Sequence, residues 1–326
     1  MSEPTAYSID VHLGPNDWRR ALRADVHRGL SSSPKTLPPK WFYDQRGSEL
    51  FDQITRLPEY YPTRAEREII ELRAMEIVKR AAADTVIELG SGTSTKTQLL
   101  LNAAVASGIV RRFVPFDVSE TTLREASEQI GRKYPTLAVH AVVGDFEHHL
   151  SRLPVEGRTM VLFLGSTIGN FIPTHRRQFF HDLRAALKSG DSLLLGTDLV
   201  KDPARLVAAY DDAAGVTAEF NRNVLTVVNR ELGANFRPEL FDHVALWDPD
   251  QEWIEMRLRA STVQHVAIED LDLAVAFESG EELHTEISAK FRRDGVQAEL
   301  TEAGFELAEW WTDSAGDFAL SLAFAE

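Results

Sequence analysis

The sequence predicts an α/β protein with an open, mostly parallel sheet and a second, discontinuous α+β lobe. Three observations predict this: a strand–turn–helix unit at residues 84–101, regular alternation of strands and helices up to residue 200, and a strand-rich block over 243–290. The expected boundaries are 65–200 with 291–326 for the sheet domain, 12–64 with 201–290 for the lobe, and 1–11 for a flexible leader.

Composition and charge exclude several classes of partner. The chain has 326 residues, 35 basic and 50 acidic side chains and a net charge of −15, which disfavours nucleic acid and anionic membranes as partners. It has no cysteine, so it has no disulfide or thiolate metal site. No apolar run approaches the ~20 residues that span a bilayer. We expect a cytoplasmic monomer that binds a small molecule.

The elements before the sheet are mostly helical. A spacing of apolar residues predicts a helix over 15–29, and the prolines of 31–40 favour an extended segment. Another helix is expected over 48–57, and an aromatic-rich turn over 58–64 precedes a long helix that ends near residue 82. The tyrosines of this turn are expected to be half-buried packing residues unless a ligand lies beside them.

The turn after the first strand contains Gly90 and Gly92, which allow positive φ and close approach of a ligand to the backbone. Thr95 stands where a dinucleotide fingerprint has its third glycine and where a phosphate-binding P-loop has its second. The pattern Glu-x-Gly-x-Gly, beginning at Glu88, fits S-adenosylmethionine (SAM) methyltransferases without exception. A structural turn without a ligand is the remaining alternative.

Acidic and aromatic residues follow the next strands of the sheet. Asp117 ends the strand at 112–117, where its carboxylate can accept hydrogen bonds from ribose hydroxyls. Asp145 and Phe146 follow the strand at 137–143, and offer an acceptor and a ring for an adenine base. Taken alone, each aspartate fits a turn or helix cap better than a ligand site. Together, these strand ends favour a nucleoside-type cofactor.

The remaining elements include the second lobe and the end of the sheet. Glu286 and Ser288 lie two residues apart on an expected strand, so their side chains share one face. The last two strands, at 305–311 and 318–324, are separated by a short turn and predict an antiparallel pair at the sheet edge. A Rossmann-like sheet that ends in such a reversed strand is typical of SAM-dependent methyltransferases.

Four stretches resemble the histidine-specific N-alpha-methyltransferases of ergothioneine biosynthesis found in mycobacteria and their relatives. The resemblance implies transfer of three methyl groups from SAM to the α-amino nitrogen of L-histidine, giving hercynine. It covers nearly the whole chain beyond the leader. The stretches are LPPKWFYD at 37–44, LPEYYPTR at 57–64, FLGSTIGN at 163–170 and GTDLVKD at 196–202.

The same resemblance implies roles for individual residues. The residues that the resemblance implies for SAM binding are Gly90, Lys96, Asp117, Asp145 and Phe146. Gly92 of the glycine turn is expected to bind SAM with them. Those implied for the amino acid are Tyr60, Asn170 and Tyr210 at its carboxylate and amine end, and Glu286, Ser288 and Met256 at the imidazole. Tyr43 is implied to lie close to the methylated nitrogen, so Tyr43, Tyr60 and Asn170 are the expected catalytic residues. Because they come from both lobes, we expect the pocket in a cleft between the lobes.

Two alternatives stay open from the sequence. One is a methyltransferase of the same fold that acts on another amine, such as tryptophan, and the pocket residues rather than the sheet decide this. The other is a nucleotide-binding protein that uses residues 90–97 as a degenerate P-loop. No metal is expected, because methyl transfer needs none and the adjacent His148 and His149 have no carboxylate at ligand spacing.

Overall fold

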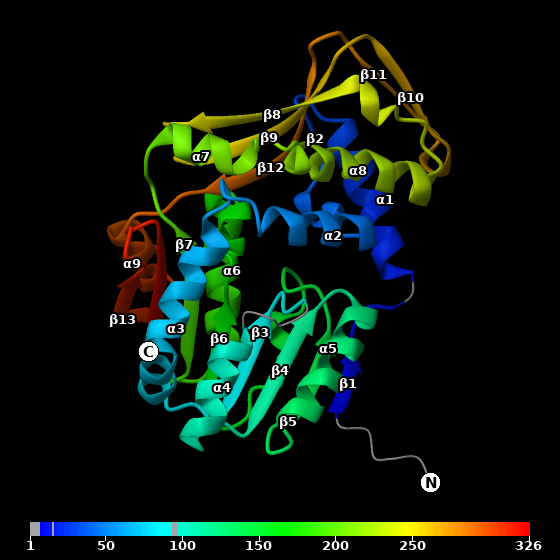
Figure 1. Cartoon of the computed structure of the whole chain (residues 1–326). Coiled ribbons are helices and arrows are strands. Elements are labelled where there is room, and N and C mark those ends of the chain that lie inside the picture. The colour runs from blue at the N-terminus through cyan, green and yellow to red at the C-terminus, as the bar shows by residue number, and fades with distance from the viewer. Residues whose placement is uncertain (1–6, 15, 93–96) are drawn as a thin grey trace. The chain divides into compact units, whose positions relative to one another are not determined.

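The computed structural model describes residues 7–14, 16–92 and 97–326, which divide into two compact units. Unit 1 holds the described residues of 1–14, 64–199 and 291–326, and unit 2 holds those of 15–63 and 200–290. Each unit has a hydrophobic core of its own. The chain therefore leaves the sheet unit and returns to it, as Figure 1 shows by colour.

Unit 1 is built on an eight-stranded sheet in the order β1-β5-β4-β3-β6-β7-β14-β13. All five residues of its central strand β3 are buried, as expected for a parallel strand covered on both faces. Neighbouring strands from β1 to β7 are parallel. The strands are β1 (Tyr7–Val11), β3 (Thr85–Leu89), β4 (Arg112–Asp117), β5 (Ala138–Val143), β6 (Thr159–Phe163), β7 (Ser192–Asp198), β13 (Phe305–Thr312) and β14 (Phe318–Ala325).

Helices alternate with these strands, as the sequence predicts. One start signal is Ser119, whose side chain accepts a hydrogen bond from the backbone of Thr122 and caps the helix that follows β4. The helical segments of this part of the chain are α3 (Pro62–Ala81), α4 (Thr97–Ser107), α5 (Glu120–Lys133), η2 (Leu150–Arg152), η3 (Thr167–Asn170), α6 (Pro173–Ala186) and α9 (Arg293–Glu302).

The C-terminal strand runs against the rest of the sheet. β14 pairs antiparallel with β7, with Phe318 opposite Asp198, and antiparallel with the edge strand β13. Its apolar side chains, such as Leu320 and Leu322, are fully buried in the core of unit 1. The predicted reversed strand is confirmed.

The predicted leader is wrong for residues 7–11. They form β1, which pairs parallel with β5 from Tyr7 opposite Val139 to Val11 opposite Val143. Ile9 packs on a small apolar cluster that includes Ala141. The pairing partner lies about 130 residues further along the chain, which is why a local pattern of five residues did not reveal the strand.

Unit 2 combines helices with a four-stranded sheet, β2-β12-β9-β8, and a hairpin of β10 and β11. Figure 1 shows β8, β9 and β12 side by side. The strands are β2 (Lys35–Thr36), β8 (Phe241–Asp248), β9 (Trp253–Ala260), β10 (Gln264–Ile268), β11 (Leu273–Phe277) and β12 (Glu282–Ala289). The helical segments are α1 (Asp17–Leu30), η1 (Pro39–Phe42), α2 (Gln45–Ile54), α7 (Pro203–Tyr210), α8 (Val216–Leu232), η4 (Pro238–Leu240) and η5 (Glu269–Leu271).

Helices α7 and α8 belong to the core of unit 2. The carboxylate of Asp202 accepts a hydrogen bond of 2.7 Å from the backbone of Ala204, and Pro203 occupies the first helical position. Buried residues of α8, such as Val224 and Val228, share one apolar cluster with Leu258 of β9. In the described part of the chain, no helix is both long and apolar enough to cross a membrane.

Candidate functional site

The turn after β3 has the conformation that its glycines allow. Gly90 and Gly92 have φ of 68° and 49°, and the backbone N–H groups of Gly90 and Ser91 donate to the carbonyl of Phe116. A Cβ added at Gly92 would meet nothing within 4 Å, so the backbone is open on that side. Lys96, implied for SAM, lies outside the described residues.

Asp117 ends β4 beside this turn. Its Oδ2 accepts a hydrogen bond of 2.9 Å from the backbone of Gly92, and its Oδ1 accepts one of 3.0 Å from Ser119. Burial raises the pKa of the Asp117 carboxyl, and the backbone donors act in the opposite direction. A carboxylate has about four acceptor positions, so one residue can shape the turn and still accept ligand hydroxyls.

Phe146 lies next to the same turn. Its Cε1 is 3.8 Å from the position that a Cβ on Gly90 would occupy, and its ring packs against Phe163 at 5.4 Å between centroids. The neighbouring Asp145 accepts a hydrogen bond of 2.9 Å from the backbone of Glu147. The structure therefore gathers Gly90, Gly92, Asp117 and Phe146 at the carboxyl ends of three adjacent strands.

Asn170 ends η3, in a loop held by two hydrogen bonds to side chains. The backbone of Gly165 donates to Oε1 of Glu66 at 2.6 Å, and the backbone of Asp198 donates to Oγ of Ser166 at 2.9 Å. Glu66 is 0% exposed on α3. The sequence analysis missed it, although an acidic residue on the inward face of a helix is an unusual feature that could have drawn attention.

Three tyrosines and a glutamate gather in unit 2. The rings of Tyr60 and Tyr210 lie 6.3 Å apart between centroids. The pKa of the Tyr43 hydroxyl is raised well above its ordinary value, first by burial and then by the nearby Glu286 carboxylate and the phenols of Tyr60 and Tyr210. Tyr43 is 45% exposed as a whole residue, although its hydroxyl is buried among these groups.

The ring of Tyr43 is held by its aromatic neighbours, Phe51 at 5.5 Å and Phe220 at 5.4 Å between centroids. With its pKa raised, the hydroxyl of Tyr43 stays protonated at neutral pH. It can donate and accept hydrogen bonds there, but it does not act as a phenolate base.

A β-bulge turns Glu286 toward the core of unit 2. Before the bulge, His284 lies opposite Arg257; after it, Glu286 lies opposite Met256 and Ser288 lies opposite Ile254. Side chains directly opposite each other on neighbouring strands point to the same face of the sheet. In a regular strand, side chains two residues apart also share a face, so His284 and Glu286 would point the same way. The extra residue in the bulge places Glu286 on the opposite face from His284.

Ser288 and Met256 are 3% and 1% exposed, and lie with Glu286 on the inner face of this sheet. The prediction that Glu286 and Ser288 share a face is confirmed. The bulge that selects the inner face was not predicted.

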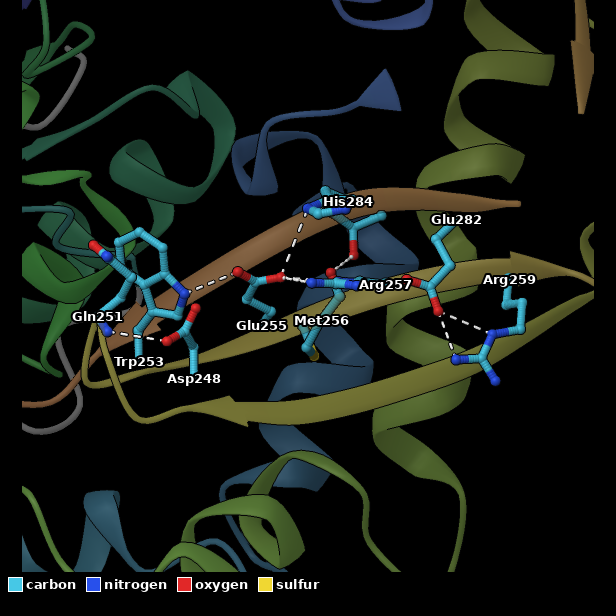
Figure 2. Close-up of polar contacts among 10 residues, drawn as sticks. Asp248, Gln251, Trp253, Glu255, Met256, Arg257, Arg259, Glu282 and His284 are labelled. Atoms are coloured by element: carbon cyan, nitrogen blue, oxygen red, sulfur yellow. Dashed lines mark hydrogen bonds and ion pairs between the residues drawn. The ribbon is translucent and has the colours of Figure 1, made fainter. Parts of the chain in front are cut away.

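Charged side chains fix the register on the opposite, outer face (Figure 2). Arg257 pairs with both Glu255 and Glu282, and Arg259 donates two hydrogen bonds to Glu282, at 2.9 and 2.6 Å. The bonds to Glu282 join β9 and β12 just before the bulge, whereas the pair of Arg257 and Glu255 lies within β9. Individually, such partly exposed pairs stabilise little, but together they oppose a slip of one residue.

Two further polar groups hold Tyr210. Nζ of Lys290 donates hydrogen bonds to Oη of Tyr210 at 2.9 Å and to Oγ of Ser288 at 2.8 Å. Nε2 of His243 donates to the backbone carbonyl of Tyr210 at 2.8 Å, while Nδ1 accepts from Asn221 at 2.9 Å. The sequence analysis missed both, although Lys290 continues the two-residue period of Glu286 and Ser288.

Thr285 stabilises the bulge, because its buried Oγ1 donates a hydrogen bond of 2.9 Å to the carbonyl of Met256. Thr285→Val removes this donor with little change of volume, and we expect the free energy of unfolding to fall by about 1–3 kcal/mol. Thr285→Ser is the control, because it keeps the hydroxyl. Urea midpoints that fall equally in both variants would contradict this role.

His243 makes stability depend on pH. Burial lowers its pKa, and the hydrogen bond to the Tyr210 carbonyl opposes this shift only in part. The unfolded state then binds a proton more readily, so this stabilisation is present above about pH 6.5 and is lost as the pH falls below it. We expect His243→Gln to flatten the decline of the unfolding midpoint between about pH 7 and 5. Parallel curves for variant and parent would refute the assignment.

Comparisons with known proteins identify the family. A family model described as histidine-specific, SAM-dependent methyltransferase matches residues 22–325. The chain is 59% identical over 316 residues to the histidine N-alpha-methyltransferase of Mycolicibacterium smegmatis, which covers 97% of this chain and 98% of the relative. The protein of the same name from Mycobacterium tuberculosis is 57% identical with the same coverage. Ergothioneine biosynthesis protein 1 of Schizosaccharomyces pombe is 31% identical over 226 residues, 66% of this chain and 29% of that protein.

The match with the family model extends through both units, and two relatives of more than half identity agree with it in name. The resemblance predicted from the four sequence stretches is therefore confirmed. The chain belongs to the SAM-dependent, histidine-specific methyltransferase family.

Proposed function

We propose that this protein transfers three methyl groups from SAM to the α-amino nitrogen of L-histidine and so produces hercynine for ergothioneine synthesis. The observation that carries the proposal is the inward-facing pair of Glu286 and Ser288, beside Met256 and in the same unit as Tyr43, Tyr60 and Tyr210. The names of the relatives support the same reaction.

We assign the cofactor to the turn after β3 and its neighbours. The open backbone at Gly92, the Asp117 carboxylate and the ring of Phe146 beside Gly90 fit a nucleoside with ribose hydroxyls and a flat base. Asp145 is assigned to the adenine amine, and Lys96 to the cofactor as well. When bound, SAM supplies a methyl group on a positively charged sulfur, and the N–C bond forms as the S–C bond breaks to leave a neutral thioether.

The residues at the amine end bind and orient the nucleophile. An α-amine is mostly protonated near neutral pH, so it loses a proton before each attack. Tyr43 remains a neutral phenol, and with Tyr60 and Asn170 it directs the lone pair through hydrogen bonds without adding charge. Aromatic faces also tolerate the growing quaternary ammonium, which can no longer donate hydrogen bonds. Tyr210 binds the carboxylate end.

The ring end selects histidine. The carboxylate of Glu286 accepts from one imidazole N–H, while the hydroxyl of Ser288 pairs with the other nitrogen. An apolar side chain could form a hydrogen bond with neither group, and sites that recognise a ligand through buried hydrogen bonds reject such analogues strongly. Met256 fills the space beside the ring. A different amino acid, such as tryptophan, is the competing substrate that this assignment disfavours.

Mass spectrometry tests the proposed function directly. The purified protein is incubated with SAM and an equimolar mixture of the twenty amino acids, and we expect mass increases of one to three methyl groups on histidine alone. Methylation of tryptophan or another amino acid in its place would overturn the substrate assignment.

The same mixture tests the role of Glu286. Glu286→Ala removes the acceptor for the imidazole N–H, so we expect the ratio of kcat/KM for histidine to that for tryptophan to fall by about 10-fold or more. Glu278→Ala is the matched control, because Glu278 is an exposed glutamate that lies outside both β9 and β12. An unchanged ratio in Glu286→Ala would show that this carboxylate does not recognise the imidazole ring.

Asp117 tests the cofactor half separately. Asp117→Ala removes the assigned acceptor for the ribose hydroxyls, and we expect SAM binding to weaken by about 1.5–3 kcal/mol in calorimetry. Asp117→Asn keeps one carbonyl oxygen at the turn and should weaken binding less. If both variants retain the parent affinity for SAM and the parent unfolding midpoint, the ribose assignment is wrong.

A further inference from the structure

Lys290 is a buried cation next to two residues assigned to the substrate. It directly follows β12 and is only 4% exposed. Its Nζ lies 2.9 Å from Oη of Tyr210, 2.8 Å from Oγ of Ser288 and 4.6 Å from the centroid of the Tyr210 ring. The two hydroxyl oxygens are themselves 2.7 Å apart, so the three groups form a closed triangle of hydrogen bonds.

The chemistry of the three groups limits how this triangle is arranged. An ammonium only donates, so both hydroxyl oxygens accept from Lys290. One hydroxyl proton then lies between Tyr210 and Ser288, and the second hydroxyl proton has no place within the triangle. Lys290 thereby restricts the directions in which both hydroxyls can donate.

A charge-assisted hydrogen bond also changes how strongly the accepting hydroxyl donates its own hydrogen bond. A hydroxyl that accepts from an ammonium is polarised and donates more strongly to the next acceptor along the chain of hydrogen bonds. The effect is larger where water is excluded, as it is around Lys290 and Ser288. A ligand group that accepts a hydrogen bond from the polarised hydroxyl, such as a carboxylate or a ring nitrogen, is therefore bound more strongly.

We propose that Lys290 is a positioning residue of the amino-acid site: it orients the hydroxyls of Tyr210 and Ser288 and polarises the one that donates to the substrate. This proposal rests on the proposed function in one respect, namely that Tyr210 and Ser288 bind the amino acid. Because Tyr210 serves the carboxylate end and Ser288 the ring end, Lys290 couples recognition of the two ends. Its positive charge also favours a substrate that carries a carboxylate over one that does not.

Lys290→Met is the first test, because it removes the charge and the donors at similar length. We expect the KM for histidine to rise about 10- to 100-fold, while the Kd for SAM stays within about twofold of the parent. Lys201→Met is the matched control. Nζ of Lys201 donates to the hydroxyl of Tyr61 at 2.7 Å and lies 4.3 Å from its ring, so the variant removes the same lysine–phenol contact from residues not assigned to the substrate.

Two ligands distinguish the effect of losing the charge of Lys290 from the effect of a disturbed fold. Histidinol has an alcohol where histidine has a carboxylate, so calorimetry compares the Kd of histidine with that of histidinol. We expect Lys290→Met to reduce the preference for histidine about 10-fold, and Lys290→Gln, which keeps a neutral donor, to restore histidine binding only in part. Lys290→Gln also serves if the methionine variant does not fold.

Three results would overturn the proposal. These are a histidine KM in Lys290→Met equal to that of the parent, an equal weakening of histidine and histidinol, and a parallel loss of SAM affinity and unfolding midpoint. The parent's substrate is determined first by mass spectrometry. If it is another amino acid, the proposed function fails, and the test of Lys290 is run with that amino acid and its amino alcohol.

Discussion

The proposed amino-acid site depends on one irregularity of the backbone, the β-bulge between His284 and Glu286. On one side of it, ion pairs of Arg257 and Arg259 hold β12 against β9. On the other, Glu286 and Ser288 turn to the inner face, where Met256 lies. A slip of one residue would exchange the two faces and present the wrong set of side chains to the site. In the proposed site, the buried hydroxyl of Thr285 and the outer ion pairs therefore serve substrate recognition as well as stability.

Much of the fold could be predicted because its signals are local. Buried runs such as Val86–Leu89 and positive-φ turns such as Gly90 are visible in single short windows, and the alternation of strands and helices fixes the sheet type. The strand at residues 7–11 escaped prediction because its pairing with β5 lies far along the chain. The bulge escaped for a similar reason: it appears only when the register of two strands is known.

Prediction of the site was limited in a different way. Motif resemblance implied the residues that face a ligand, and the structure brings Tyr43, Tyr60, Tyr210 and Glu286 together in unit 2 and the glycine turn, Asp117 and Phe146 together in unit 1. It implied nothing about the groups that hold them. Glu66, His243 and Lys290 act through hydrogen bonds to partners 33 to 99 residues away. Such partners follow from tertiary packing, which no short pattern records.

The polar groups of unit 2 also give the proposed amino-acid site a direction. Lys290, which only donates hydrogen bonds, lies beside both Tyr210 and Ser288, while the carboxylate of Glu286, which accepts them, is assigned to the ring N–H. Histidine bound in reverse would bring its carboxylate toward Glu286, and like charges in a partly buried site repel strongly. Tyr43, held as a neutral phenol by burial and by Glu286, adds no charge that would compete for the amine. In the proposed site, selectivity for the amino acid and alignment of its nitrogen thus follow from one arrangement of fixed donors and acceptors, set by the register of β12.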